Sequence, residues 1–242
     1  MSNQKEKRVI ILAGGKGTRL EPYTISFPKP LMPIGKYPIL EIIIRQLVHF
    51  GYTHITITVN HQAEIIKAFF GNGDKWGVKI DYSFETSPLG TMGPLTLISD
   101  LPEDFLVMNG DVLTDLNYSE FFQDHLENEA LFTISSFIRL QKNEYGVLVK
   151  NSKDLLTVFQ EKPVTKFEVS MGVYAVSKKL IDLIPVNKPY GFDDLMIKLI
   201  GSNKKVRVNM FDGYWLDIGR PDDYRQAIDE FELSKSKFLP ND

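Results

Sequence analysis

Short apolar runs alternate with helical segments along the first 110 residues, and this alternation constrains the possible fold more than any other feature. The runs at 8–13, 54–59 and 105–109 are rich in β-branched or large apolar residues, which is typical of buried strands. Apolar residues at helical spacing occupy 38–50 and 62–70, and a glycine follows each of these segments, as at many helix ends. The order predicts an α/β fold: a doubly wound, mainly parallel Rossmann-like sheet with helices on both faces.

The pattern changes after a helical segment at 118–128. Four strand candidates joined by short turns follow, at 130–138, 145–150, 155–160 and 168–176. They predict a smaller antiparallel part beside the parallel sheet. Helices are expected at 93–99, 178–184, 192–200 and 221–233, and further strands at 78–84 and 205–210. The proline-rich stretch at 22–38 is expected to be an ordered loop. No linker divides the chain, so we expect one domain over 1–242.

Composition excludes several classes of function. The formal net charge of −3 gives no general basic excess for binding nucleic acid, and the absence of cysteine excludes disulfides, thiolate nucleophiles and zinc–thiolate sites. The polar segment 1–8 lacks the apolar core of a signal peptide, and the longest apolar runs are too short to cross a membrane. We therefore expect a soluble, cytoplasmic protein with neither a nucleic-acid nor a membrane partner.

A glycine-rich turn follows the first strand and carries the main chemical signal. Closely spaced glycines allow backbone N–H groups to approach phosphate oxygens, and Lys16 and Arg19 add positive charge. The turn is not a P-loop, and Leu20 stands where a dinucleotide-binding fingerprint requires glycine. A tight turn with solvated basic residues is the alternative. Because ligands bind at the carboxyl ends of parallel strands, this turn and Asp111 are expected on the same rim.

Six motifs in order along the chain extend this signal. They are GGKGTRL at 14–20, FPKPL at 27–31, PLGT at 88–91, NGD at 109–111, EKP at 161–163 and WLDIG at 215–219. The set resembles the signature of the sugar-1-phosphate nucleotidylyltransferases. PLGTMG at 88–93 is most similar to the mannose- and heptose-1-phosphate guanylyltransferases. The resemblance implies transfer of a nucleoside monophosphate from an NTP to a sugar 1-phosphate, with release of pyrophosphate, by direct Mg²⁺-assisted in-line attack.

The resemblance also implies roles for individual residues. Arg19 and Lys29 would bind the triphosphate, and Asp111 and Asp217 would hold Mg²⁺. Lys162 would hold the sugar phosphate, so these five are the candidate catalytic residues. The candidate nucleotide-binding set is Leu12, Ala13, Gly14, Gly15, Gly17, Thr18, Arg19, Lys29, Glu85, Pro88, Gly90, Thr91, Asn109 and Gly110, and the candidate sugar-phosphate set is Gly146, Glu161, Lys162, Ser170 and Gly172. The nucleotide half would lie near 1–115 and the sugar-facing half near 116–242.

The chemistry of these residues agrees with the implied reaction. A sugar phosphate, with a second pKa of roughly 6, is largely a dianion at neutral pH and needs no protein base in order to attack. The four histidines, His49, His54, His61 and His125, show no metal-ligand or catalytic-triad spacing. Carboxylates suit Mg²⁺, which prefers oxygen ligands. Taken singly, Asp111, Lys29 and Lys162 could also be ordinary turn or loop residues. Ser170 stands where many relatives carry Asn, which leaves the sugar open.

Glu85 lies just before PLGT and bears on the choice of base. A carboxylate can accept from guanine N1–H and N2–H together, whereas uracil and thymine offer one such donor. GTP is therefore favoured, with UTP, dTTP and CTP as alternatives. A non-catalytic nucleotide-sugar-binding regulatory homologue is disfavoured because Arg19 and both metal-binding aspartates are present. A kinase is disfavoured because no Walker lysine–serine pair occurs. A homodimer is possible on base rates alone.

Overall fold

A seven-stranded mixed sheet forms the centre of the molecule. The computed structural model describes residues 7–60 and 62–239, so most of the segment 1–8, and His61, lie outside it. The strand order is β12-β8-β11-β6-β1-β4-β5. The strands are β1 (Arg8–Leu12), β4 (His54–Val59), β5 (Lys79–Phe84), β6 (Asp104–Asn109), β8 (Phe132–Lys142), β11 (Val164–Ser177) and β12 (Val206–Phe211). Only β11 runs antiparallel to its neighbours β6 and β8, so four of the six strand pairs are parallel.

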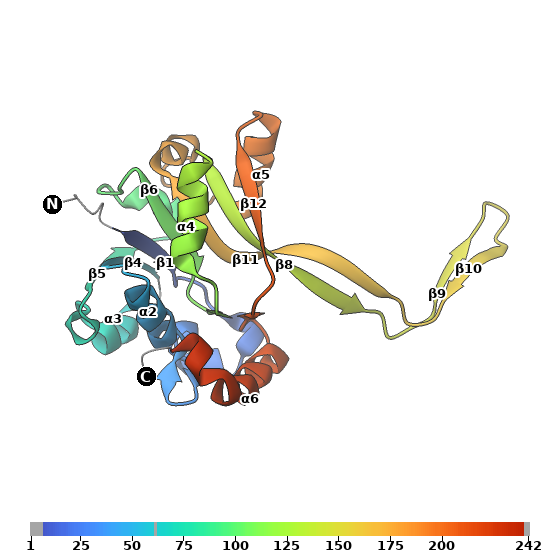
Figure 1. Ribbon diagram of the computed structural model, residues 1–242, viewed down its shortest axis with the longest axis horizontal. Helices are drawn as coiled ribbons and strands as arrows, with labels where there is room; N and C mark the ends of the chain where they lie inside the picture. The colour runs from blue at the N-terminus through green and yellow to red at the C-terminus, as the bar shows by residue number, and fades with distance from the viewer. Residues whose placement is uncertain (1–6, 61, 240–242) are drawn as a thin grey trace.

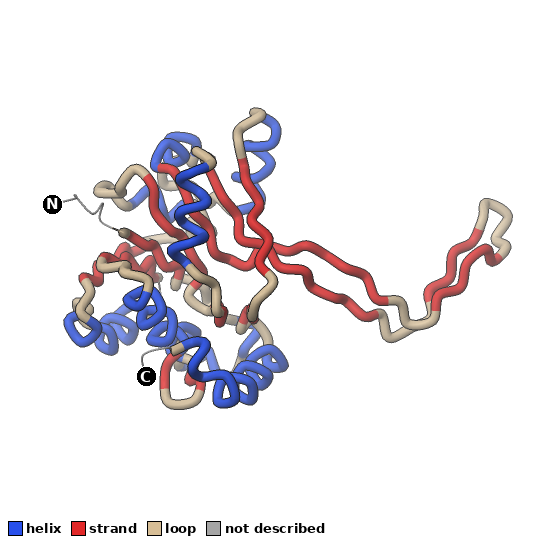
Figure 2. Tube along the Cα trace, viewed as in Figure 1, coloured by secondary structure: helices blue, strands red, loops and turns tan. Residues whose placement is uncertain are grey.

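Two apolar cores lie on opposite faces of this sheet. On β1, Val9 and Ile11 belong to one core and Ile10 to the other, as the two-residue period of a strand requires. The helices α2 (Ile39–His49), α3 (Ala63–Phe70), α4 (Tyr118–Glu127) and α6 (Pro221–Phe238) pack on the first core. The second core is covered by α5 (Phe192–Gly201) and two 3₁₀ helices (Figure 1, Figure 2). The predicted doubly wound, mainly parallel α/β fold is confirmed.

Several short elements differ from the sequence-based expectations. The segments expected as helices at 93–99 and 178–184 form 3₁₀ helices over Gly93–Leu97 and Lys178–Leu183. The proline-rich stretch is not simply a loop, because it contains one helical turn, Tyr23–Ser26, one 3₁₀ turn, Lys29–Leu31, and the short hairpin of Pro33–Ile34 with Tyr37–Pro38. The antiparallel pair β7 (Val112–Thr114) and β13 (Trp215–Asp217) was not predicted, because three-residue strands show no periodicity.

The largest departure is an arm that leaves the body of the molecule. The strands β8 and β11 extend beyond their predicted ends and stay paired from Ser136–Ser170 out to Lys142–Val164. A hairpin of β9 (Val147–Lys150) and β10 (Leu156–Gln160) continues from them and turns at residues 151–155, as expected (Figure 1). We call residues 138–168 the arm. The antiparallel part of the chain is therefore divided between the central sheet and this projection.

Across residues 7–60 and 62–239, the helices are too short or too polar to span a bilayer.

Candidate active site

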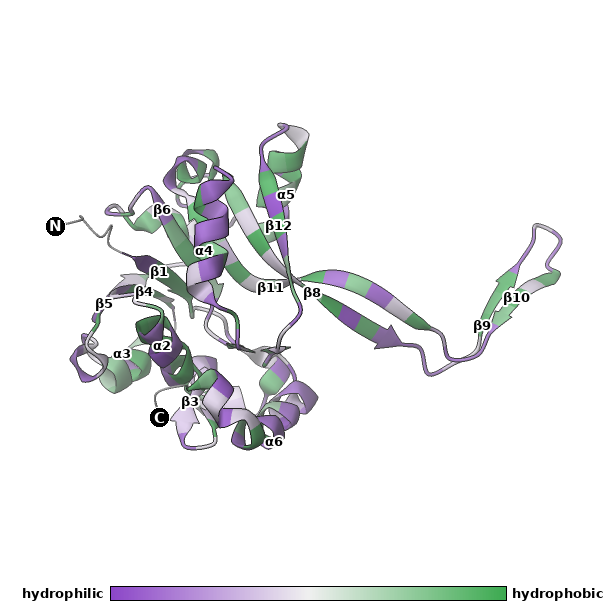
Figure 3. Ribbon diagram, in the orientation of Figure 1, coloured by the Kyte–Doolittle hydropathy of each residue, from purple (hydrophilic) through white to green (hydrophobic). Residues whose placement is uncertain are grey.

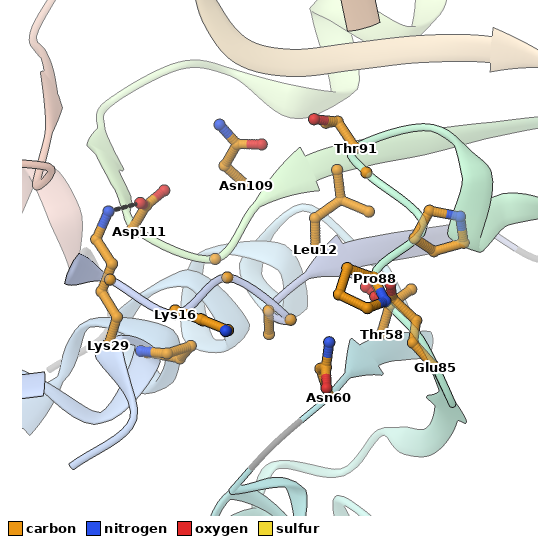
Figure 4. Close-up of a pocket in the computed structure, with 18 of the residues that line it drawn as sticks. Leu12, Lys16, Lys29, Thr58, Asn60, Glu85, Pro88, Thr91, Asn109 and Asp111 are labelled. Carbon is orange, nitrogen blue, oxygen red and sulfur yellow. Dashed lines mark hydrogen bonds and ion pairs between the residues drawn. The ribbon is translucent and has the colours of Figure 1, made fainter. Parts of the chain in front are cut away.

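A cavity of about 540 Å³ opens at the carboxyl ends of β1, β4 and β6 (Figure 4). The backbone brings the three strand ends together: Ala13 N–H donates to the carbonyl of Thr58 at 3.0 Å, and Gly110 N–H donates to the carbonyl of Leu12 at 3.0 Å. The glycine-rich turn and Asp111 consequently line one cavity. This confirms the expectation, drawn from strand order, that they share a rim of the sheet.

Glycine is required in the turn for different reasons at different positions. Gly17 has φ = 66° at the start of the 3₁₀ helix Thr18–Leu20, a conformation that favours glycine. A β-carbon at Gly14 would lie 2.7 Å from Oε1 of Glu85. At Gly15, in contrast, a β-carbon would meet no described atom within 4 Å, and φ is not in the left-handed range. The protein itself thus does not require glycine at position 15, which faces the open cavity.

Lys29 and Asp111 form a close ion pair at the edge of the cavity, marked by a dashed line in Figure 4. The 3₁₀ helix Lys29–Leu31, which follows Pro28 and contains Pro30, positions the lysine. Both side chains are largely buried, with 13% and 18% exposed. The second carboxylate oxygen of Asp111, Oδ1, is buried and has no hydrogen-bond partner among the described residues. A buried oxygen of this kind is costly unless a ligand or cation meets it.

Asp217 is placed beside Asp111 by the unpredicted strand pair. On β13 it stands opposite Val112 of β7, and the N–H of Ile218 donates to the carbonyl of Asp111 at 3.1 Å. Burial raises the pKa of Asp217, and the nearby charge of Asp111 raises it further, whereas Lys29 and Arg19 act in the opposite direction. Repulsion between the two carboxylates and the unpartnered Asp111 oxygen fit a hard divalent cation such as Mg²⁺.

A second cavity, of about 500 Å³, adjoins Asp217 on the side of the arm. Arg19 lines both cavities, whereas Asp217 lines only the second. The remaining lining residues are Arg139, Leu140, Gln141, Lys142, Phe167, Val169, Arg220 and Asp223. Three arginines give this space a positive lining, and Asp223 lies 3.6 Å from Arg139. Two ligands could thus lie on either side of Arg19 and the aspartates.

The PLGT loop closes the far side of the first cavity. Glu85 anchors it, since its carboxylate accepts a hydrogen bond from Leu89 N–H at 3.0 Å. Burial raises the pKa of Glu85, and this backbone hydrogen bond lowers it. Gly90 has φ = 77°, and a β-carbon there would lie 2.8 Å from the carbonyl oxygen of Tyr190. Close backbone packing therefore fixes where Pro88 and Thr91 line the cavity.

Gly172 marks the point where β11 passes Asn109. It has φ = 76° at a register irregularity between Ser170 and Tyr174, and a β-carbon there would lie 2.5 Å from Nδ2 of Asn109. Trp215 Nε1–H donates to the carbonyl of Met171 at 2.9 Å, which ties the same segment to β13. Ser170 Oγ donates to the hydroxyl of Tyr174 at 3.1 Å. Asn109, at the first cavity, is thus in contact with the segment that carries Ser170 and Gly172.

The predicted site residues fall into two groups. All fourteen candidate nucleotide-binding residues line the first cavity, and Asp111 lies there with them. Gly146, Glu161 and Lys162 line neither cavity, because they lie on the exposed arm. Ser170 and Gly172 also line neither cavity. Lys162, expected with Asp217 in the catalytic set, is not in the cavity that Asp217 lines. Gly146 and Glu161 do stay near each other: a β-carbon at Gly146 would lie 3.3 Å from Oε2 of Glu161.

Sequence reasoning missed several lining residues. Thr58 and Asn60 line the first cavity at the end of β4. The carboxyl-end rule would have found them, because that strand was correctly predicted. Arg139 and Arg220 line the second cavity. They carried no such signal, since an isolated arginine in a strand or at a helix start usually faces solvent.

The fold and the cavities define the class: an α/β protein with a cavity at the carboxyl ends of parallel strands, lined by a glycine-rich turn, and with two neighbouring carboxylates. The chain belongs to the nucleotidyl transferase family, whose model matches residues 8–233.

Relatives and solved structures agree with this family. The chain is 35% identical to a UTP–glucose-1-phosphate uridylyltransferase of Synechocystis sp., over 91% of this chain and 62% of that protein. It is also 35% identical to a mannose-1-phosphate guanyltransferase of Kluyveromyces lactis, over 96% of this chain and 66% of that protein. The chain thus spans just under two thirds of each. A structure of HddC from Yersinia pseudotuberculosis complexed with GMP-PN matches with a TM-score of 0.72 and 27% identity, covering 93% of this chain and 99% of that one.

Proposed function

We propose that the protein is a sugar-1-phosphate nucleotidylyltransferase that joins a nucleoside monophosphate to a sugar 1-phosphate and releases pyrophosphate. The observation that carries this proposal is the position of Arg19, which lines both cavities next to Asp111 and Asp217. The first cavity is suited to a nucleoside triphosphate, because the glycine-rich turn and two lysines line it. The second is suited to a phosphorylated sugar, because arginines line it.

The proposed reaction needs charge neutralisation more than covalent help from the protein. A phosphate oxygen of the sugar 1-phosphate attacks the α-phosphorus of the nucleotide. A new P–O bond forms as the bond to the β-phosphate bridging oxygen breaks, and pyrophosphate takes the electron pair. Arg19 and Lys29 offset the negative charge that develops at the α-phosphate. Asp111 and Asp217 would hold Mg²⁺, which when bound neutralises phosphate charge.

The proposal does not assign a general base. A sugar phosphate dianion attacks without losing a proton. Among the described residues, histidine lines neither cavity. Of the three described histidines, His54 and His125 are buried elsewhere, one within 2.6 Å of Asp81 and the other within 2.8 Å of Thr133. The proposed role of the chain is therefore to hold two anions in line and to exclude water from the reacting phosphate.

We further propose GTP as the preferred nucleotide. Glu85 offers a partly buried carboxylate in the first cavity, and guanine presents two adjacent donors to such a group. Support is divided, because relatives named as guanylyltransferases and as a uridylyltransferase match to a similar degree. The structural neighbour solved with GMP-PN supports the guanine assignment. UTP, dTTP and CTP remain the alternatives.

The test is a matrix of NTPs against sugar 1-phosphates, with pyrophosphate release as the measurement. We expect release with GTP above that with UTP, dTTP, CTP and ATP. Glu85→Gln should reduce GTP turnover more than UTP turnover, because a donor NH₂ would then face a guanine donor, at a cost of about 1–3 kcal/mol. Glu64→Gln, at an exposed position on α3, is the matched control. Wild-type preference for UTP would defeat the GTP proposal alone, whereas no pyrophosphate from any pair would defeat the transferase proposal.

A further inference from the structure

The arm exposes an unusual amount of apolar side chain. The described residues 7–60 and 62–239 include 27 exposed large apolar side chains, and eleven of them lie within the 31 residues from 138 to 168. They are Ile138, Leu140, Tyr145, Leu148, Val149, Leu155, Leu156, Val158, Phe159, Val164 and Phe167. Figure 3 shows the hydrophobic colour concentrated on β9 and β10 at the end of the arm. A soluble monomer rarely exposes so large an apolar patch, so another surface is expected to cover it.

The apolar residues occupy both faces of the arm. Residues that pair across an antiparallel ladder point to the same side. Leu148 pairs with Phe159, and Val149 pairs with Val158 on the opposite face. A two-stranded hairpin with both faces in water is marginally stable at best. The surface that covers the arm must therefore enclose it rather than contact one edge.

None of the five candidate sugar-phosphate residues lines the second cavity, and three of them lie on the arm. Gly146, Glu161 and Lys162 lie at the bend where β8 and β11 give way to the hairpin, and Asn143 N–H donates to the carbonyl of Pro163 at 2.9 Å across this bend. The base of the arm, in contrast, reaches the second cavity through Arg139 and Phe167.

The arm cannot deliver these residues to its own cavity while its strands stay paired. The ladder is continuous from Ser136–Ser170 to Lys142–Val164, and six residues of strand span roughly 20 Å. Folding the bend back onto the same chain would require several of these pairs to break. A second copy needs no such change, because a two-fold axis allows each arm to reach the other copy's cavity in its extended form.

Charge also favours a second copy. The arm holds six Lys or Arg against four Asp or Glu, and the rest of the chain holds 22 against 27. A net positive arm therefore meets a net negative body when two copies exchange arms. The body side of the second cavity is balanced in charge, with Arg19 and Arg220 against Asp217 and Asp223, so its arginines do not exclude Lys162.

We propose that two copies of this chain exchange arms, so that each arm packs on the other copy and places Glu161 and Lys162 at its second cavity. Each complete site would then contain Arg19 and Asp217 of one copy and Lys162 of the other. The part of this proposal that gives Lys162 a substrate rests on the proposed function. The exchange itself does not, and its test can be made without measuring activity.

The natural absence of cysteine allows a direct cross-linking test. Lys162→Cys and Arg220→Cys are made as single variants, mixed and oxidised, since Arg220 is an exposed residue of the second cavity. We expect an interchain 162–220 disulfide, identified by mass spectrometry, and a dimer by light scattering. Leu148→Asp/Phe159→Asp should abolish both without changing the helical signal in the circular dichroism spectrum, because both side chains are exposed on β9 and β10, outside the helices. Leu233→Asp, which is 87% exposed on α6, is the control and should leave the dimer intact.

Other outcomes would overturn the exchange. One is a monomer with no 162–220 disulfide in the mixture. Another concerns the double variant Lys162→Cys/Arg220→Cys. If it forms only a disulfide within one chain, the arm folds back on its own copy. A dimer that Leu233→Asp abolishes but Leu148→Asp/Phe159→Asp leaves intact would place the interface elsewhere.

Mixing inactive variants tests the role of Lys162. Lys162→Ala and Asp217→Asn homodimers are each expected to be nearly inactive. In a mixed dimer, the copy with intact Asp217 receives the arm with intact Lys162, so one of the two sites is complete. Random re-pairing makes about half of the dimers mixed, so about one quarter of wild-type activity should return. An interchain disulfide without this recovery would leave the exchange standing and overturn the assignment of Lys162. An interchain 162–220 disulfide in the cysteine variants, together with a wild-type chain that releases no pyrophosphate, would defeat the proposed function alone.

Discussion

Lys29 neutralises one carboxylate oxygen of Asp111, while the other oxygen, Oδ1, is buried without a hydrogen-bond partner among the described residues. Asp217 is held next to this group by the β7–β13 pair. A phosphate-bound cation would satisfy both carboxylates, and Lys29 would then be able to contact phosphate. The pair is therefore well suited to a site in which charge is redistributed when substrates bind.

Removing the metal or either aspartate should abolish activity while preserving the fold. We expect EDTA to stop pyrophosphate release and Mg²⁺ to restore it. Asp111→Asn and Asp217→Asn should each lower kcat by about 100-fold or more, because a cation held by two carboxylates loses a charged ligand in either variant. Asp212→Asn, at an exposed position near Asp217, is the control. Full activity in EDTA would end the metal proposal.

Arg19→Ala should affect turnover more than substrate binding. Arg19 lines both cavities, so it is placed to contact both phosphates as charge develops between them. Interactions that strengthen in the transition state contribute to kcat rather than to KM. We expect kcat to fall about 100-fold with KM for either substrate changed only a few-fold. Arg225→Ala, with an arginine that is 77% exposed, should remain at wild-type rates. A change confined to KM would show that Arg19 only binds ground-state phosphate.

Much of the nucleotide side of the site could be predicted from sequence. The turn after β1 and the NGD motif after β6 each follow a buried strand, and the rule for parallel sheets places both on one rim. Glu85 could be included because it precedes the PLGT motif. These signals are local in sequence, and the parallel sheet that joins them is itself the most readable part of the chain.

The sugar side could not be predicted to the same extent. Arg139 and Arg220 reach the second cavity from an arm strand and from the start of α6, and neither position differs in sequence from a solvated surface arginine. The arm strands were predicted, but alternation gives the same pattern whether a strand packs on its own chain or projects from it. The sequence therefore gives no sign that Lys162, expected with Asp217 in the catalytic set, lies outside the cavity that Asp217 lines.

Gly15→Ala should fold normally and bind nucleotide poorly. A β-carbon at position 15 would meet no described protein atom, so the new methyl group projects into the space of the first cavity. We expect an unchanged melting temperature and an increase in KM for the NTP of about 10-fold or more, because backbone groups could no longer approach phosphate closely. Gly201→Ala is a matched control, since a β-carbon there is also unobstructed and lies at the exposed end of α5. If both variants had the same KM for the NTP, the glycine-rich turn would not be part of the phosphate-binding site.

The last prediction concerns the pH dependence of stability. Asp124 on α4 accepts hydrogen bonds from Arg207 Nε at 2.7 Å and Nη2 at 2.8 Å, and from Asn209 at 3.0 Å. The Arg207 hydrogen bond is the main cause that lowers the pKa of Asp124 below its ordinary value. A carboxyl group whose pKa is lower in the folded state than in the unfolded state stabilises the folded protein. This stabilisation is complete at pH values above the pKa of the carboxyl in the unfolded state, which is about 3.9. That contribution is lost as the pH falls through the folded pKa.

Asp124→Asn should therefore reduce the free energy of unfolding at pH 7 by about 0.5–1 kcal/mol, as expected for an ion pair that remains partly hydrated. The difference from wild type should shrink below about pH 4, where Asp124 becomes protonated in the unfolded and then in the folded state. Urea unfolding at pH 7, 5, 4 and 3 measures this difference. Asp229→Asn, at an exposed position on α6, should show a small and pH-independent change. A difference for Asp124→Asn that stays constant from pH 7 to pH 3 would mean that the Asp124 charge does not stabilise the attachment of β12 to α4.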